Sequence, residues 1–420
     1  MGNYAELWKR LGVDLKRHDK LCEVLPEIYS SVYLNQEDRP EGMNYFNMVI
    51  SEIHGLRIEE LDKERAKGRK VVGTFCVFVP DEVILALDAI SIGLCAGSEF
   101  WVQSGETVMP KNMCPLIKAF MGAATDATCP YYLSTDLIVG ETTCDGKKKA
   151  WEIMKDKKDI YVMDLPQMKR EKDILHWKEE ILAFIDRMEK LTGNKLTVEK
   201  LKAGIKLCNE KRRALKRLND LRKNKPSPIS GLDCLLITQI AFYDDPKRFI
   251  ENTNKLCDEL EERVKSGKIK NNKKRILVTG TPMAVPNWKL HSLIESLDAE
   301  VVLEESCTGS RYFENEVSEE GDTIEELAYN IAKRYMKINC ACFTPNEGRA
   351  EDIVRYSKEY KVDGVIDYCL SFCHTYAVEH RSLKKVLEEN NIPILRIETD
   401  YSNEDAGQLT TRIEAFLEMI

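Results

Sequence analysis

The 420-residue sequence lacks the short cysteine and glycine motifs that most often identify a cofactor site. It contains no C-x-x-C pair, which disfavours a zinc ribbon and a thioredoxin-like dithiol. The segment GETTCDGKKK (140–149) resembles a phosphate loop, but five residues separate its glycines and Lys148 follows Lys147 where Ser or Thr is needed. GTPMAVP (280–286) lacks the G-x-G-x-x-G pattern. We therefore expect neither ATP nor a nicotinamide cofactor at these loops.

The sequence also lacks an excess of positive charge and any long apolar run. Its 62 Lys and Arg against 70 Asp and Glu give a net charge of −8, so nothing indicates a nucleic-acid partner. Residues 1–20 are charged throughout and lack the apolar core of a secretory signal, and no later segment approaches a membrane span. The start Met1-Gly2 does not indicate myristoylation, because Glu6 occupies the Ser/Thr position of that motif. We expect a cytoplasmic protein without a membrane partner.

Apolar strand-like runs alternate with amphipathic helical segments in both halves of the chain. The expected strands are 69–79, 136–140, 159–164, 275–283, 300–304, 363–368 and 393–398, and a helix is expected at 83–92. This order predicts an α/β fold of two doubly wound, Rossmann-like parallel-sheet domains. The expected divisions are a helical N-terminal segment (1–65), a first α/β domain (66–170), a helical connector (171–270) ending in a basic run at 268–274, and a second α/β domain (271–420).

Fourteen cysteines in 420 residues are a much lower proportion than a disulfide scaffold contains, so the positions of the cysteines must indicate their role. Ligands of parallel sheets bind in the loops that follow the carboxyl ends of strands. Cys144, Cys307 and Cys373 each follow an expected strand. Cys144 also begins a helix, whose amide groups would favour its thiolate. These positions favour metal ligation.

Other cysteines fall into two sets. Cys114 and Cys129 each precede a proline, which is common beside iron–sulfur clusters, and Cys340 and Cys342 lie between a helix and a Pro-Asn turn. Packing explains Cys76, which lies inside an expected apolar strand, and four cysteines in helical patterns, namely Cys22, Cys208, Cys234 and Cys257. Cys95 remains open between the two interpretations.

Two titratable residues near these cysteines are candidates for moving protons. Glu141 precedes the Cys144 loop and could carry a proton in a desolvated cleft or cap the loop backbone. His374 follows Cys373 and could donate a proton, or simply form a structural hydrogen bond. Lys147, Lys148 and Lys149 could offset the charge of thiolates or form a solvated helix start.

Four segments resemble the family of 2-hydroxyacyl-CoA dehydratase and benzoyl-CoA reductase subunits. They are NMCPLIKAFMG, DLIVGETTCDGKKK, VDGVIDYCLSFCHTY and the C-terminal IPILRIETDYSNEDAGQLTTRIEAF, within a match from Val71 to the C-terminus. The resemblance implies two α/β domains with a 4Fe-4S cluster between them, held by Cys114, Cys144 and Cys373. TCPYYL, ESCTG and NCACFTPN further resemble the double-cubane cluster branch, which implies an 8Fe-9S cluster held by those three thiolates together with Cys129, Cys307 and Cys340, with Cys342 as the alternative to Cys340.

This branch implies an oxidoreductase that receives electrons from an ATP-hydrolysing iron–sulfur reductase dimer. It also implies a homodimer and the reduction of small unsaturated molecules such as acetylene. Three other interpretations remain open at this point: a 2-hydroxyacyl-CoA dehydratase subunit with a single 4Fe-4S cluster, a zinc-stabilised α/β binding module, and a metal-free binding protein whose cysteines are only packed.

Overall fold

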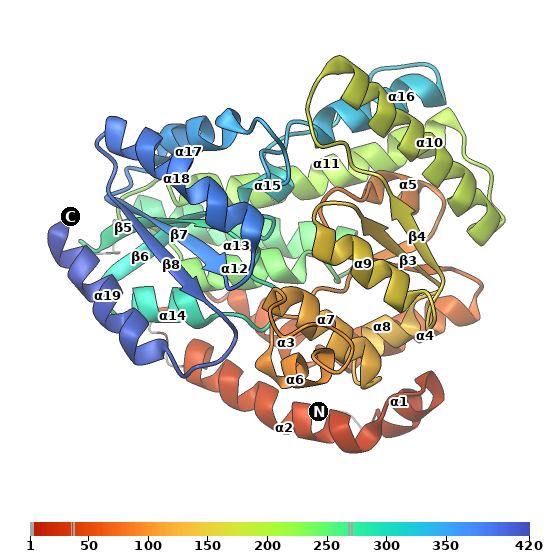
Figure 1. The fold of residues 1–420 in the computed structure, drawn as a ribbon, viewed down its shortest axis with the longest axis horizontal. Helices are drawn as coiled ribbons and strands as arrows, with labels where there is room; N and C mark the ends of the chain where they lie inside the picture. The colour runs from red at the N-terminus through yellow and green to blue at the C-terminus, as the bar shows by residue number, and fades with distance from the viewer. Residues whose placement is uncertain (1–3, 35, 37, 268, 270–271) are drawn as a thin grey trace.

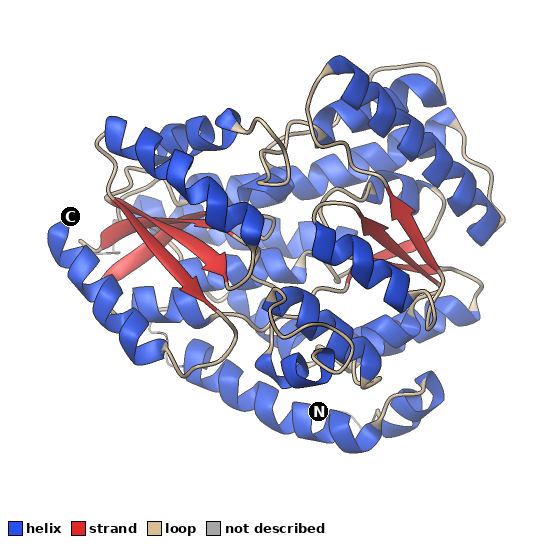
Figure 2. Cartoon of the chain, viewed as in Figure 1, coloured by secondary structure: helices blue, strands red, loops and turns tan. Residues whose placement is uncertain are grey.

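Two parallel sheets with the same strand order form the framework of the molecule (Figure 1, Figure 2). The computed structural model describes residues 4–34, 36, 38–267, 269 and 272–420, so Met1-Gly2 and part of the basic run at 268–274 lie outside the described residues. The first sheet has the order β2-β1-β3-β4, with β1 (Val71–Thr74), β2 (Ile90–Gly93), β3 (Leu137–Glu141) and β4 (Ile160–Met163). The second has the order β6-β5-β7-β8, with β5 (Lys274–Gly280), β6 (Ala299–Glu305), β7 (Gly364–Leu370) and β8 (Ile394–Thr399).

All neighbouring strands in both sheets are parallel, which confirms the predicted fold class. In each sheet the first strand along the chain is flanked by the second and the third. This arrangement creates a crevice at the carboxyl edge, between β1 and β3 and again between β5 and β7. The two crevices are the natural ligand positions of the fold.

Two expected elements in the first half were wrong. The strand expected at 69–79 ends at Thr74, because Phe75 turns its ring onto Phe120 and Trp151, with ring centroids 4.6 and 5.0 Å away. Cys76 therefore follows the strand instead of lying inside it. The helix expected at 83–92 is shorter, because Asp88 adopts a left-handed backbone (φ 60°) and residues 90–93 form β2.

Helices surround the sheets and fill the space between them. An N-terminal layer contains α1 (Ala5–Leu11), α2 (Leu15–Tyr29), the π-helical η1 (Ser30–Leu34), α3 (Met43–Ser51) and α4 (Leu56–Ala66). The first sheet carries α5 (Asp81–Ala86), η2 (Glu99–Trp101), α6 (Val102–Gly105), α7 (Pro115–Thr125), α8 (Pro130–Ser134) and α9 (Asp145–Met154). Four helices link the halves: α10 (Glu171–Thr192), α11 (Val198–Leu221), α12 (Gly231–Ile240) and α13 (Pro246–Ser266). The second sheet carries α14 (Lys289–Glu295), α15 (Ser310–Phe313), α16 (Ile324–Tyr335), α17 (Glu347–Glu359), α18 (His374–Glu389) and α19 (Ala406–Met419).

The two halves are docked closely by backbone contacts. The Gly97 amide donates to the Val285 carbonyl at 2.9 Å, and a Cβ at Gly97 would lie 2.1 Å from the Ala284 carbonyl oxygen. Only glycine permits this approach. At a second point the Thr344 amide donates to the Gln167 carbonyl at 2.9 Å. The loops after β2 and β5 are thereby held against one another, and the loop after β4 is held against the segment between α16 and α17.

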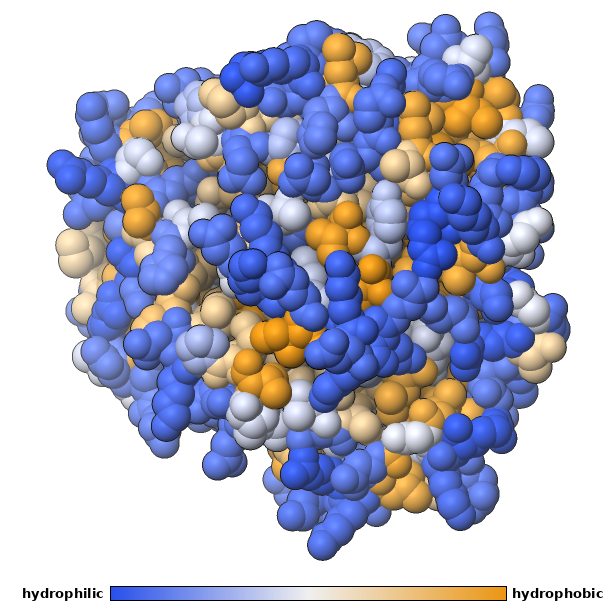
Figure 3. Space-filling model, turned by 45° about the vertical axis from the view of Figure 1, so that its right-hand side comes forward, coloured by the Kyte–Doolittle hydropathy of each residue, from blue (hydrophilic) through white to orange (hydrophobic). Residues whose placement is uncertain are grey.

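Within the described part of the chain, every helix is too short or too polar to cross a lipid bilayer. On the face drawn in Figure 3, apolar side chains form small groups among hydrophilic ones.

Candidate metal centre

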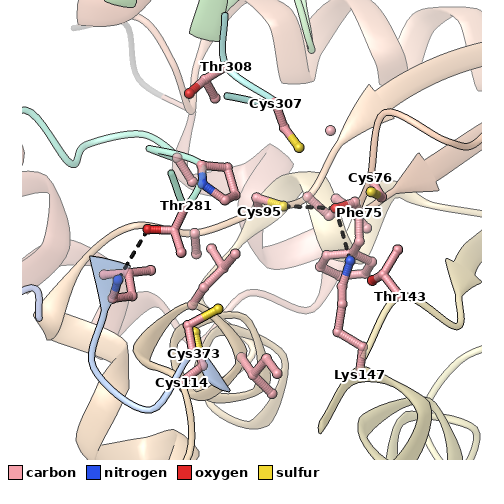
Figure 4. Close-up of a pocket in the computed structure, with 18 of the residues that line it drawn as sticks. Phe75, Cys76, Cys95, Cys114, Thr143, Lys147, Thr281, Cys307, Thr308 and Cys373 are labelled. Atoms are coloured by element: carbon pink, nitrogen blue, oxygen red, sulfur yellow. Dashed lines mark hydrogen bonds between the residues drawn. The ribbon is translucent and has the colours of Figure 1, made fainter. Parts of the chain in front are cut away.

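A cavity of about 560 Å³ lies where the carboxyl ends of the two sheets meet (Figure 4). Its size is within the range of ordinary cofactor and ligand sites. Residues from both halves line it, and they include nine of the fourteen cysteines: Cys76, Cys95, Cys114, Cys129, Cys144, Cys307, Cys340, Cys342 and Cys373. All nine are free thiols. Every cysteine that the sequence proposed as a ligand therefore lines this one cavity.

Five of these cysteines directly follow strands. Cys76, Cys95 and Cys144 follow β1, β2 and β3 of the first sheet, whereas Cys307 and Cys373 follow β6 and β7 of the second. Parallel strands deliver their following loops to one edge of a sheet. Because the carboxyl edges of the two sheets face the same cavity, thiols that are far apart in the sequence meet there.

Helix N-termini position four of the thiols. Cys114, Cys129, Cys144 and Cys373 are the N-cap residues of α7, α8, α9 and α18. Burial raises the pKa of Cys144, whereas a hydrogen bond from the Lys147 backbone amide acts in the opposite direction. The unpaired amides at a helix start suit a thiolate or another anion. The fold thus supplies partial positive charge at these sulfur atoms without a side chain.

Cys114, Cys144 and Cys373 form what we call the first cysteine group. The Cys114 and Cys373 side chains lie together in Figure 4, and a hydrogen bond from the Cys114 thiol lowers the pKa of Cys373. Cys144 is close enough for the charge of a Cys373 thiolate to raise its pKa. The group contains two residues from the first half and one from the second. It comprises the three thiols that the family resemblance assigns to a 4Fe-4S cluster.

Cys76, Cys307, Cys340 and Cys342 form what we call the second cysteine group. A hydrogen bond from Cys76 lowers the pKa of Cys307, and one from Cys342 lowers the pKa of Cys340 to about 5. The two pairs also interact, since the charge of Cys340 raises the pKa of Cys307. Each pair therefore has one thiol that ionises readily, which is the form that binds metal ions.

Among the described residues, the remaining two thiols of the cavity form no hydrogen bond with another cysteine, although the charge of Cys307 contributes to the raised pKa of Cys95. Cys129 lies near Tyr131 and Tyr132, and burial raises its pKa without a contribution from any other cysteine. Cys95 donates to the Phe75 carbonyl at 3.2 Å. Of the sequence-based candidates, Cys129 is thus the one whose pKa no other cysteine affects by a hydrogen bond or by its charge.

An acid and a cation flank one cysteine of each half in the same order. Glu141 ends β3 and pairs with Lys147, and Cys144 lies between them in the sequence. Glu305 ends β6 and pairs with Arg311, and Cys307 lies between those two. In both cases the acid and the cation are six residues apart and buried. Each pair holds a cation at the base of a cysteine loop, where it can offset thiolate charge.

Tyr376 links Arg311 to the second cysteine group. The Arg311 guanidinium donates to the Tyr376 hydroxyl oxygen, which leaves the hydroxyl hydrogen for the Cys340 sulfur 3.5 Å away. Tyr376 is buried, and the neighbouring Arg349 guanidinium also lies over its ring, 4.9 Å from the centroid. The contacts fix a hydrogen-bond donor against the sulfur that has the lowered pKa.

The two candidate proton carriers occupy different positions. Glu141 is fully buried and does not line the cavity; one of its carboxylate oxygens accepts from Lys147 and from Thr143 at 3.0 Å, and the other has no hydrogen-bond partner among the described residues. His374 is exposed and lines the cavity at the start of α18. A proton role for either residue remains a prediction.

Two parallel sheets with a cysteine-lined cavity between them define the class of this protein, an α/β protein with many free thiols at the carboxyl ends of its strands. The chain matches the family model described as "2-hydroxyglutaryl-CoA dehydratase, D-component" over residues 76–420. It therefore belongs to this family, as the sequence predicted.

The alignments with three curated relatives cover most of this chain and about nine tenths or more of each relative. The chain is 38% identical over 359 residues to YjiM of Escherichia coli (strain K12), a protein provisionally named as a dehydratase subunit, with 85% of this chain and 93% of the relative covered. It is 25% identical to the (R)-phenyllactyl-CoA dehydratase beta subunit of Clostridium sporogenes, covering 84% and 92%. It is 24% identical to one of the benzoyl-CoA reductase subunits of Thauera aromatica, covering 83% and 89%.

Sequence reasoning missed Cys76 and Arg311, and it left the role of Lys147 open between offsetting thiolate charge and starting a solvated helix. Cys76 was hidden because TFCVFV has the composition of a buried strand. The spacing of Glu141 to Lys147 and of Glu305 to Arg311, each around a cysteine, is a signal that could have identified both loops from the sequence alone.

Proposed function

We propose that this chain is the cluster-binding subunit of a low-potential iron–sulfur reductase and holds an 8Fe-9S double-cubane cluster. The observation that carries the proposal is the presence of two cysteine groups in one cavity, each drawing thiols from both α/β halves. A single cubane would need only the first cysteine group. The second group, with two paired thiols and its own buried cation, supports a second cubane.

The proposed ligands are three thiolates from each group. The first group supplies Cys114, Cys144 and Cys373. From the second group we assign Cys76, Cys307 and Cys340, so that Cys76 takes the place expected for Cys129. Cys340 is preferred over Cys342 because its pKa is lowered to about 5 by the hydrogen bond from Cys342. Cys342 then acts as a hydrogen-bond donor beside the cluster.

When bound, the cluster would supply single electrons at low potential. The chain's own residues create the conditions for this chemistry. Lys147 and Arg311 offset the thiolate charge, and the apolar cavity lining limits water. Reduction of acetylene to ethylene consumes two electrons and two protons; an external donor supplies the electrons, and His374 and Glu141 are the proposed proton carriers.

The electron donor is proposed to be a separate ATP-hydrolysing iron–sulfur reductase dimer. Two observations support this division of labour. The relatives are named as subunits or components, which indicates that they act in assemblies. The sequence has no phosphate loop at its one candidate segment, so ATP hydrolysis is assigned to the partner. We further propose that the chain itself forms a homodimer in the cytoplasm.

A second candidate is a 2-hydroxyacyl-CoA dehydratase subunit with one 4Fe-4S cluster at the first cysteine group. The description of the family and the name of one relative favour it, because both refer to acyl-CoA dehydratases. In that case the second cysteine group would remain as free thiols, and the substrate would be a CoA thioester.

Anaerobic purification followed by iron and acid-labile sulfide analysis separates these candidates. The double cubane predicts about eight irons and nine sulfides per chain, whereas a dehydratase cluster predicts about four of each. Alkylation of the folded holoprotein gives a second readout, because only the dehydratase candidate leaves the second cysteine group reactive. A colourless anaerobic sample with stoichiometric zinc and no iron would contradict both and favour a zinc-stabilised binding module.

A further inference from the structure

A second cluster of metal-ligating side chains lies in the N-terminal helical layer, away from both cysteine groups. It consists of His18, Cys22 and His54. These residues precede the stretch matched by the family model, which begins at residue 76. The helix α2 that carries two of them runs along the edge of the molecule beneath α3 and α6 in Figure 1. None of the three residues is among the ligands proposed for the double-cubane cluster, so the cluster of side chains is a separate candidate site.

The three potential ligand atoms are spaced as around one small cation. His18 and Cys22 are four residues apart and lie on one face of α2, whereas His54 lies in the turn between α3 and α4. His18 Nε2 is 2.9 Å from His54 Nδ1 and 3.8 Å from Cys22 Sγ, and ligand atoms of all three lie within 4.8 Å of one another. Tetrahedral zinc would separate two nitrogens by about 3.3 Å and a nitrogen from a sulfur by about 3.6 Å.

Aromatic side chains hold the two imidazoles in place. The Trp8 ring lies 4.2 Å from the His18 ring, and the Trp8 indole donates to the His54 carbonyl at 2.7 Å. The Tyr131 ring packs edge-on against His54. Burial lowers the pKa of His18 to about 4 and that of His54 to about 3, so both rings are neutral and can bind a metal ion. The two imidazoles are thus held in place in the neutral form, whereas burial raises the pKa of Cys22 to about 11, so its proton has to leave when a metal ion binds.

We propose that His18, Cys22 and His54 bind one Zn²⁺ ion through two imidazoles and one thiolate. Borderline-soft nitrogen and sulfur donors in this ratio suit zinc better than magnesium or calcium, which prefer oxygen. Binding displaces the Cys22 proton, which is released to solvent. The ion joins α2 to the turn at 52–55 and thus fastens the N-terminal layer over the cysteine-lined cavity.

The fourth position of this zinc site faces open space. Among the described residues no fourth side-chain ligand belongs to the cluster. Cys22 and His54 both line a second cavity of about 270 Å³, and His54 also lines the large cysteine-lined cavity. Zinc sites with three protein ligands keep the fourth for water or a small molecule. We assign water to that position.

The test uses the full-length protein, purified anaerobically with its iron, supplied with zinc chloride and desalted. We expect about one zinc per chain, and X-ray absorption at the zinc edge should show one sulfur at about 2.3 Å with two or three nitrogen or oxygen neighbours near 2.0 Å. Cys22→Ser and His54→Gln should each lower the zinc content at least fivefold while the iron content is unchanged. Cys257→Ser and His176→Asn are the controls, because these residues lie in other helices.

Two results would overturn the proposed zinc site. A zinc-free wild type would show that the two histidines form only a hydrogen-bonded pair and would overturn the proposal. An all-sulfur zinc environment would also overturn it, since the ion would then occupy unfilled positions in the cysteine-lined cavity. The zinc content and the X-ray absorption spectrum are measured on the wild type. They therefore decide the test even if a variant fails to fold. Because iron is measured in the same samples, failure of the zinc site is distinguishable from failure of the proposed cluster.

Discussion

The two cysteine groups stabilise thiolate charge in different ways. In the first, the thiols are N-cap residues. The hydrogen bond to Cys373 and burial raise the pKa of Cys114, while the Leu116 and Ile117 backbone amides act in the opposite direction. Hydrogen bonds from the Cys114 thiol and the Tyr376 amide lower the pKa of Cys373. In the second, the thiols lie in loops without long helices directly behind them, and Lys147 and Arg311 supply full positive charges. Backbone dipoles are fixed by the fold, whereas a cation can be removed by one substitution. The second group should therefore be the more sensitive to mutation of residues that are not ligands.

The largest expected effect comes from removing one thiol of either group. Cys373→Ser and Cys307→Ser should each reduce the bound iron by about half, because each deprives only one cubane of a ligand. Iron analysis and electron paramagnetic resonance of anaerobic samples measure this. Cys129→Ser is the matched control and should retain nearly all iron. Equal iron loss in all three variants would contradict the division into two groups.

The second-largest effect is expected from removing Lys147, the buried cation of the Cys144 loop. Lys147→Met leaves the Glu141 carboxylate buried without its partner and should lower the free energy of unfolding by about 3–5 kcal/mol. Combining it with Glu141→Gln should recover most of this loss, because the uncompensated charge is removed. Urea unfolding of the iron-free proteins provides the measurement. If the double variant is as unstable as the single one, packing of the lysine stem is the dominant contribution.

Acid should lower the free energy of unfolding by protonating Glu304, which lies in the strand before Cys307. Burial alone would raise the pKa of Glu304, but the Arg222 guanidinium and His291 overcome it and lower the pKa to about 2. The carboxylate therefore stabilises the fold fully above about pH 4.5 and loses this contribution as the pH falls toward 2, a change of about 3 kcal/mol. Unfolding of the iron-free protein between pH 6 and pH 3 should be less steep in Glu304→Gln. Identical slopes would refute this assignment.

The smallest effect is expected from removing the hydrogen bond between Tyr376 and Cys340 of the second cysteine group. Tyr376→Phe removes the hydroxyl beside the Cys340 sulfur. Loss of a hydrogen bond worth about 1 kcal/mol should lower the reduction potential of the nearby centre by about 40 mV. Redox titration followed by electron paramagnetic resonance can resolve this shift. Tyr356→Phe, in a separate core cluster of the second half, is the control and should leave the potential unchanged.

Sequence alone predicted the layered fold because period-two apolar runs and helical segments alternate along most of the chain. It failed at β2, where only four residues, Ile90–Gly93, form the strand and a left-handed Asp88 separates them from the preceding helix. For the site, strand ends were a reliable guide to Cys144, Cys307 and Cys373. Cys114 and Cys129 have the same local pattern, a cysteine before a proline at a helix start, and only the tertiary structure reveals that Cys114 meets another thiol.

The participation of both halves in each cysteine group determines when a metal centre can form during synthesis. The first group is incomplete until Cys373 has been made, long after Cys114 and Cys144. A nascent chain that has emerged as far as the first sheet offers those two thiols but not the third thiol of the group. If the proposed ligands are correct, a cluster can be held at this group only after β7 and the loop behind it have been translated, and a product that stops short of them would retain no cluster there.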